Sequence, residues 1–186
     1  KQNIEGIDLE ASYRHRVNLL GGGPESLSLR VFATKLMTIS QQSPGSAVDN
    51  QLGQIGGLVL PKYKATGVLG YSNGAWSGSL IGRFIDGGIL DRFLVESSVP
   101  LRNAANALIN TIDDNHVPSI FYTDLNVNFQ PTNVDGLRVY ANVTNLLDRD
   151  PPTTPTSIGR TGPSEVSAAI HDQLGRRFTV GFSYQF

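Results

Sequence analysis

The last eleven residues of the chain alternate strictly between apolar and polar side chains. Phe178, Val180, Phe182, Tyr184 and Phe186 are apolar, whereas the residues between them are small or polar. A period of two predicts a β-strand with two unlike faces. A tilted strand of about 10 residues is long enough to cross a lipid bilayer, which would cover such an apolar face. We therefore expect residues 176–186 to form a strand with one face toward lipid.

The same alternation occurs in six earlier segments. Each of them places apolar side chains on one face and charged or hydroxyl-bearing side chains on the other. These segments are residues 4–16, 27–39, 64–71, 76–84, 118–129 and 137–144. With the terminal segment they predict an all-β chain of about seven antiparallel up-and-down strands.

The connections between the predicted strands alternate in length: short, then long, three times. The short ones are residues 21–24, 72–74 and 130–136, and the long ones are about 40–61, 86–117 and 145–175. A barrel in an outer membrane has short periplasmic turns and long extracellular loops, whereas a β-sandwich mixes lengths at both ends. The order of the connections therefore favours a segment of a transmembrane barrel over a soluble pair of packed sheets.

Three local features refine this picture. Asn73 and Gly74 are expected to supply the positive φ angles of a tight hairpin. Tyr71 and Trp76 flank that turn, where an aromatic girdle would lie at a membrane interface. The loop at residues 40–61 lacks a period and is expected to be exposed, and the helical spacing of apolar residues at 101–112 indicates a short surface helix.

Composition excludes several classes of function. The formal net charge of -1 gives no basic footprint for nucleic acid. Because the chain has no cysteine, disulfides, thiolate metal sites and a cysteine nucleophile are all excluded. No run of about 18 apolar residues predicts a membrane-spanning helix. The chain of 186 residues begins with Lys1 rather than methionine, so we expect a fragment of a longer protein.

Catalytic chemistry has little support in the sequence. The three histidines, His15, His116 and His171, lie in no Ser-His-Asp or zinc-binding motif. The acids next to His116, at positions 113 and 114, are interpreted as a solvated loop rather than as a metal site. We expect no enzyme activity, no metal and no cofactor.

Four motifs, taken in order, resemble the TonB-dependent outer-membrane receptors, specifically the last third of their barrel. Residues 6–10 are similar to that family's Gly-hydrophobic-acid strand start, and residues 122–125 to its Tyr-x-Asp-Leu strand. Residues 143–152 are close to its Asn-Leu-Phe-Asp-Lys-x-Pro-Pro signature, and residues 172–178 to the entry of its last strand. Leu147 replaces the usual Phe, and His171 replaces the usual Tyr.

The resemblance implies a part of a larger transporter. Members of that family form a plugged barrel of about 22 strands and import scarce ligands such as ferric siderophores, with energy relayed by TonB. Residues 1–186 would be the C-terminal portion of that barrel, and the plug domain and TonB box are expected outside this chain. Its partners would be outer-membrane lipid, lipopolysaccharide, the plug, the barrel assembly machinery and a small-molecule ligand. A structural or adhesive autotransporter-like barrel and a diffusion porin are the alternatives.

Strand parity predicts the side chains that face the lumen. On the polar face of the predicted strands, basic residues outnumber acidic ones. This excess indicates a barrel wall that binds an anionic ligand or acidic groups of the plug. Generic lumen polarity is the competing explanation. The candidates are Arg30, Lys64, Arg83, Tyr122, Asp124, Arg138 and Arg177.

Two further groups of residues are assigned by position. The aromatic residues Phe178, Phe182, Tyr184 and Phe186 are predicted to act as an assembly signal through β-augmentation, or else simply to face lipid. Lys35 and Arg176 fall on the apolar faces of their predicted strands. They are predicted to lie together at the extracellular rim, where they would contact lipopolysaccharide phosphates. If the strands end before these two residues, both belong to loops.

Overall fold

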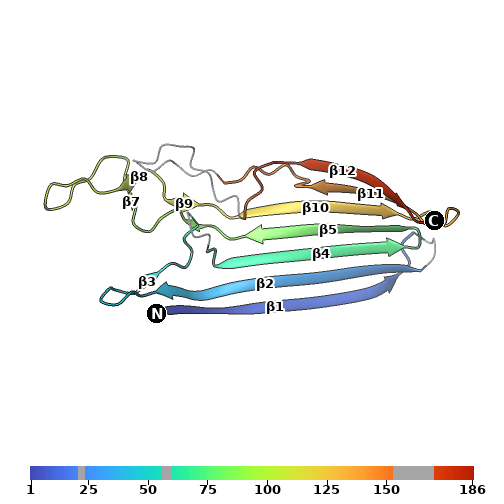
Figure 1. Ribbon diagram of the computed structural model, residues 1–186, viewed down its shortest axis with the longest axis horizontal. Coiled ribbons are helices and arrows are strands. Elements are labelled where there is room, and N and C mark those ends of the chain that lie inside the picture. The colour runs from blue at the N-terminus through green and yellow to red at the C-terminus, as the bar shows by residue number, and fades with distance from the viewer. Residues whose placement is uncertain (21–23, 56–59, 153–169) are drawn as a thin grey trace.

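The computed structural model describes residues 1–20, 24–55, 60–152 and 170–186. Seven long strands form one antiparallel meander in the order β1-β2-β4-β5-β10-β11-β12 (Figure 1). Their bounds are β1 Gln2–Val17, β2 Glu25–Gln41, β4 Tyr63–Asn73, β5 Trp76–Ile85, β10 Ile120–Phe129, β11 Leu137–Thr144 and β12 Arg177–Tyr184. These are the seven strands that the alternation predicts, with ends shifted by a few residues.

Strand register brings the apolar positions into continuous rows. One row runs side by side across all seven strands. It consists of Tyr13, Leu29, Leu69, Leu80, Leu125, Val143 and Phe178. Because directly paired residues of an antiparallel sheet point to the same face, this face of the sheet is predominantly apolar. Most of this row is exposed, as expected of a surface that meets lipid.

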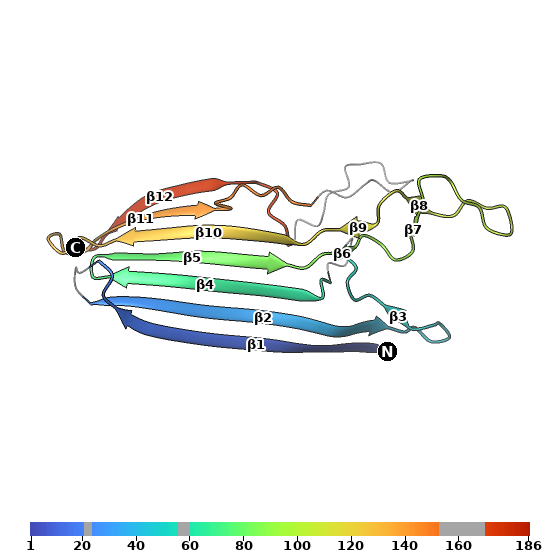
Figure 2. The ribbon, with the colours of Figure 1, turned by 180° about the vertical axis from the view of Figure 1, so that it is seen from behind.

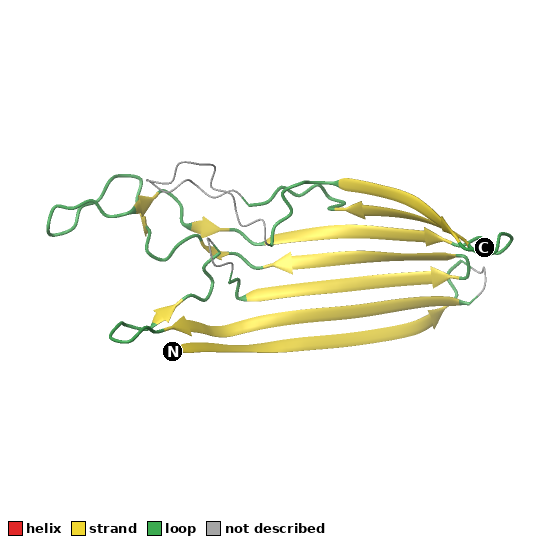
Figure 3. Cartoon of the chain, viewed as in Figure 1, coloured by secondary structure: helices red, strands yellow, loops and turns green. Residues whose placement is uncertain are grey.

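The two ends of the sheet differ. Figure 2 shows the short turns and the C-terminus at one end, and the N-terminus and the long connections at the other. Figure 3 shows that the described part of the chain consists of strands, turns and loops. None of the described residues forms a helix that is long and apolar enough to cross a bilayer.

Short strands occur within the long connections. β3 (Asp49–Asn50) pairs with β2. In the connection between β5 and β10, β6 (Gly88–Ile89) pairs antiparallel with β9 (His116–Val117), and β7 (Val95–Glu96) pairs parallel with β8 (Thr111–Ile112).

The surface helix expected at residues 101–112 is wrong. The chain instead doubles back there, with an antiparallel bridge between Arg102 and Leu108 and a bond from the Ile109 amide to the Leu101 carbonyl. Asn103 accepts hydrogen bonds from the amides of residues 105 and 107, and Asn106 has a φ of 60°. Asparagine side chains that bond nearby backbone favour turns over helices, which here outweighs the helical spacing of the apolar residues.

The hairpin after β4 is shifted by one residue from its predicted position. Asn73 still pairs with Trp76, so the two-residue turn consists of Gly74 and Ala75. Gly74 has a φ of 50°, whereas Asn73 is an ordinary strand residue. Glycine at the first turn position suits a type II′ hairpin, so one positive φ replaces the two expected from Asn73 and Gly74.

The loop predicted to be exposed at residues 40–61 is exposed over residues 41–48, but the described residues of its later part are mostly half-buried or buried. Ile55 is 2% exposed and packs with Val117, with Leu90 and Ile170 beside them. The Ile55 amide donates to the Ile89 carbonyl at 2.8 Å, and the Ile89 amide donates to the Gly53 carbonyl at 2.9 Å. The first two long connections therefore share backbone bonds and a small apolar core.

Gly88 is required by this close approach. A Cβ atom at Gly88 would lie 2.1 Å from the Gly53 carbonyl oxygen, so the two loops can meet only where residue 88 lacks a side chain. An ion pair between Arg92 and Asp49 and a bond from Arg92 to the Asn50 carbonyl hold the same loops together.

Candidate lumen site

The polar face of the sheet carries the predicted lumen residues. Arg83 pairs directly with Tyr122, Arg30 with Val68, and Lys64 with Ile85. Register places all seven candidates on the face opposite the apolar rows. The seven do not form one cluster, because they are distributed over six strands: β2, β4, β5, β10, β11 and β12.

Arg83 and Asp124 form a bidentate ion pair on neighbouring strands. Arg83 Nε donates to Asp124 Oδ2 at 3.1 Å and Nη2 donates to Oδ1 at 3.2 Å. The Arg83 guanidinium also lies 5.4 Å from the ring centroid of Tyr122, whose side chain is fully buried. Oδ1 of Asp124 accepts a further bond of 2.8 Å from the Asn145 amide. Asp124 thus joins the sheet to the turn that follows β11.

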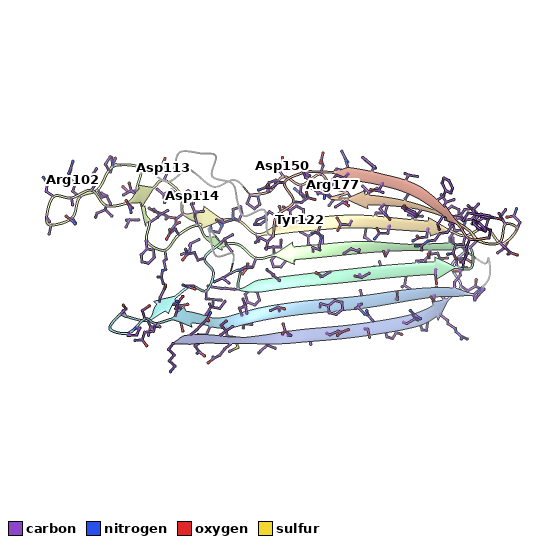
Figure 4. All side chains as sticks on the ribbon, in the orientation of Figure 1. Arg102, Asp113, Asp114, Tyr122, Asp150 and Arg177 are labelled. Atoms are coloured by element: carbon purple, nitrogen blue, oxygen red, sulfur yellow. The ribbon has the colours of Figure 1, made fainter. Side chains whose placement is uncertain are left out.

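A second ion pair lies at the start of β12. Arg177 donates from Nη1 and Nη2 to the two carboxylate oxygens of Asp172, at 2.8 and 3.2 Å. The Asp172 amide donates to the Tyr122 hydroxyl at 3.2 Å. The hydrogen bonds from Arg177 hold the pKa of the Asp172 carboxyl below its ordinary value. Figure 4 shows Tyr122 and Arg177 at the long-loop end of the sheet.

The Asn-Leu-Leu-Asp motif forms a tight turn against this network. Asn145 is fully buried with a φ of 54°, and its side chain bonds both the amide and the carbonyl of Arg149 at 2.9 Å. The Leu146 amide donates to the Thr123 carbonyl at 2.6 Å. Asp148 accepts a bond of 2.9 Å from the Arg176 amide. The motif therefore fixes the end of β11 to the strands on both sides of it.

These elements line an open cavity of about 640 Å³ on the polar face. Its lining includes Arg83, Asp124, Thr144, His171, Asp172 and Arg177. The side chain of His171 is buried, and neither ring nitrogen has a hydrogen-bond partner among the described residues. Burial, and secondarily the charge of Lys64, lowers the pKa of His171 below its ordinary value. The imidazole is therefore neutral near neutral pH.

Two lumen candidates lie away from this cavity. Arg30 stacks 5.7 Å from the Phe32 ring centroid and approaches Glu10 at 3.9 Å with both side chains exposed. Arg138 donates to Asn128 Oδ1 at 3.1 and 2.6 Å and lines a separate polar cavity of about 360 Å³. Lys64 contributes charge near His171 without lining the cavity.

Sequence reasoning did not select Asn145, His171 or Asp172 as site residues. Asn145 and Asp172 belong to the two family motifs near the C-terminus, so the motifs were the signal that could have identified them. His171 stands at the Tyr position of the last motif, but its burial depends on packing between distant segments and could not be read from the sequence.

The aromatic residues of the final strand lie on the apolar face. Phe178, Phe182 and Tyr184 are exposed there, and Phe186 is fully exposed beyond the end of β12. β12 is one edge of the described sheet, and its partner is β11. This geometry leaves main-chain groups available along the outer edge of β12.

Lys35 lies within β2, whereas Arg176 belongs to the loop just before β12; both are at the long-loop end. Lys35 pairs with Tyr63 on the apolar face, and its Nζ lies 5.6 Å from the Tyr63 ring centroid. Arg176 directly precedes β12, stacks 6.0 Å from the Phe178 ring centroid and bonds Asp148 at 3.4 Å. Because Lys35 is on β2 and Arg176 is next to β12, the two cations lie near opposite edges of the sheet rather than side by side.

Metal binding finds no support in the described part of the chain, which contains no group of three His, Asp or Glu side chains suited to an ion. Asp114 accepts a bond from the His116 backbone amide, which is an ordinary loop contact.

Comparison with known proteins identifies the family. The family described as TonB dependent receptor-like, beta-barrel, matches residues 1–146, which is more than half of the chain. No curated protein and no solved structure matches the chain. The match confirms the all-β barrel class and the outer-membrane location predicted from the sequence. The chain therefore belongs to the TonB-dependent receptor-like β-barrel family, whose members are transporters of the bacterial outer membrane rather than enzymes.

Proposed function

We propose that this chain forms part of the wall of a barrel that imports a scarce ligand, such as a ferric siderophore, with energy supplied through TonB. The observation that carries the proposal is the linked polar network of Arg83, Asp124, Asp172 and Arg177 at the long-loop end, opposite a continuous apolar face. Such a network suits a surface that binds polar groups inside a lumen, because a charged wall in a confined space focuses the electric field.

The partners follow from the two faces. The apolar face is proposed to contact outer-membrane lipid, and the polar face to contact the protein's own plug domain or an anionic ligand. The lumen residues proposed for these contacts are Arg30, Lys64, Arg83, Tyr122, Asp124, Arg138 and Arg177.

Uptake by the full-length receptor tests the function. In cells that lack other uptake routes, growth on a ferric siderophore as sole iron source should require both the receptor and TonB. The variant Arg83→Gln should reduce uptake, whereas Arg102→Gln, at the tip of an exposed loop, should not. Growth that continues without TonB, together with a large single-channel conductance, would instead identify a diffusion porin.

We also propose that the final strand is an assembly signal. Phe178, Phe182, Tyr184 and Phe186 alternate along the edge strand β12, whose outer main-chain groups can add to a strand of the barrel assembly machinery. Deleting Phe186 from the full-length receptor should lower its outer-membrane yield several-fold, while Phe186→Tyr should not. Equal yields of all three proteins would show that the aromatic residues only face lipid.

Lys35 and Arg176 are proposed to bind lipopolysaccharide phosphates at the outer rim. Both flank an aromatic ring at the long-loop end, where an exposed cation costs only about 0–1 kcal/mol. Replacing both with Ser should reduce the lipopolysaccharide that co-purifies with the receptor, and Lys35→Ser should have the larger effect because Arg176 is already paired with Asp148. Arg102→Ser is the control, and unchanged lipopolysaccharide in the double variant would exclude the contact.

A further inference from the structure

The two ion pairs of the lumen cavity expose their cations and bury their anions. The Arg83 side chain is 35% exposed and its partner Asp124 is 17% exposed. The Arg177 side chain is 40% exposed, against 6% for Asp172. Nη1 of Arg83 and Nε of Arg177 donate no hydrogen bond to any described residue. The cavity therefore presents N–H donors, and its carboxylate oxygens are already occupied.

His171 completes this lining with a group that can gain a proton. The neutral imidazole carries one donor and one acceptor nitrogen, and neither has a partner among the described residues. The charged groups around it are Lys64 on β4, Arg83 on β5, Asp124 on β10, and Asp172 and Arg177 in its own segment. The two cations and two carboxylates of the lining balance each other, so Lys64 supplies the unbalanced positive charge next to His171. One entering anion would balance that charge.

We propose that this cavity binds a carboxylate group and that His171 takes up a proton when the carboxylate enters. The planar guanidinium fork matches the two oxygens of a carboxylate, and the free N–H groups of Arg83 and Arg177 supply such donors. The inference rests on the proposed function, since it assigns a chemical class to the lumen contact. The carboxylate can come from an imported ligand or from an acidic side chain of the plug domain.

Carboxylate binding and protonation of His171 favour each other. In the empty cavity, burial and Lys64 lower the pKa of His171, so the imidazole is neutral. A carboxylate nearby favours the imidazolium and raises that pKa. Carboxylate binding therefore takes up a proton when the pH lies between the pKa of His171 in the free protein and its pKa in the complex. The affinity for the carboxylate rises as pH falls through this window, by up to about tenfold per pH unit.

Calorimetry on the full-length receptor in detergent micelles tests the proposal, with glutarate as the probe. Titrations between pH 5 and 8, in buffers of different ionisation enthalpy, should show uptake of close to one proton. His171→Gln should still bind glutarate but without proton uptake by the protein, and its only pH dependence should be that of the second carboxyl group of glutarate, at about pH 5. His116→Gln, at an exposed histidine of another loop, should behave as wild type. Arg83→Gln should weaken binding by about tenfold or more, and Arg102→Gln should not.

A second variant guards against a folding defect in His171→Gln. Lys64→Gln removes one of the charges that lower the pKa of His171, so the pH dependence should move to higher pH. Glutarate binding that is independent of pH, or equal in wild type and His171→Gln, would overturn the proposal.

The same full-length receptor distinguishes a carboxylate of an imported ligand from a carboxylate of the plug domain. If the plug supplies it, glutarate will not bind, and Arg83→Gln will increase hydrogen exchange of plug amides while Arg102→Gln will not. If neither glutarate binds nor plug exchange changes, the cavity has no carboxylate partner and the proposal fails. None of these measurements requires transport or TonB, so their failure is separate from failure of the proposed uptake function.

Discussion

Asp124→Ala should destabilise the folded barrel by about 2–4 kcal/mol. The substitution removes both acceptors of the Arg83 guanidinium and the acceptor of the Asn145 amide. A cation left unpaired in a fully buried site costs about 3–5 kcal/mol, and the lower range applies here because Arg83 is partly exposed. Urea unfolding of the full-length receptor in lipid vesicles, followed by tryptophan fluorescence, measures the difference.

Glu10→Ala is the matched control for that experiment. Glu10 and Arg30 approach at 3.9 Å on the same face, but both side chains are more than half exposed. An exposed ion pair contributes about 0–1 kcal/mol, so this variant should unfold nearly as wild type does. Equal effects of Asp124→Ala and Glu10→Ala would show that Asp124 is only one of many solvated lumen charges.

The main sheet was predictable because each strand carries its own two-faced pattern. The alternation within each segment determines which residues lie on the apolar face. A shift of one residue in any strand pairing would move that strand's apolar side chains to the polar face. The observed row from Tyr13 to Phe178 is the register that keeps every strand's apolar residues together. The lumen positions of Arg83 and Arg138 follow from the same parity.

The long connections were less predictable because their order comes from contacts between segments far apart in sequence. Ile55 is buried by Val117, and its backbone pairs with Ile89, so neither loop's local composition reveals the shared core. The helix predicted from the spacing of apolar residues at 101–112 is absent because asparagine side chains there bond to nearby backbone amides and stabilise turns. His171 likewise became a cavity residue only through packing.

The family motifs contributed a different kind of information. Their residues looked like a signature without a physical role until the structure showed what they hold. Asp124 joins β5 to the turn after β11, and Asp148 joins that turn to the start of β12. The motif at residues 143–152 is therefore an anchor for the chain at the long-loop end, which residue spacing alone does not show.

Asn145→Ala should cost about 2–5 kcal/mol, a range that overlaps the effect of Asp124→Ala. Asn145 combines a left-handed backbone, with a φ of 54°, and two side-chain hydrogen bonds to Arg149 in a fully buried position. Alanine in this conformation costs about 1–2 kcal/mol. Loss of the two bonds adds about 0.5–1.5 kcal/mol for each. The same unfolding measurement on the full-length receptor checks this sum.

Two further variants separate the contributions. Asn145→Gly accepts the positive φ and loses only the side-chain bonds, so it should be less destabilising than Asn145→Ala. Asn106→Ala tests the backbone alone, because Asn106 has a φ of 60° on an exposed loop and its side chain makes no hydrogen bond with the described residues. If Asn145→Gly and Asn145→Ala unfold alike, backbone conformation contributes nothing at this turn, and the hydrogen bonds to Arg149 alone hold the end of β11.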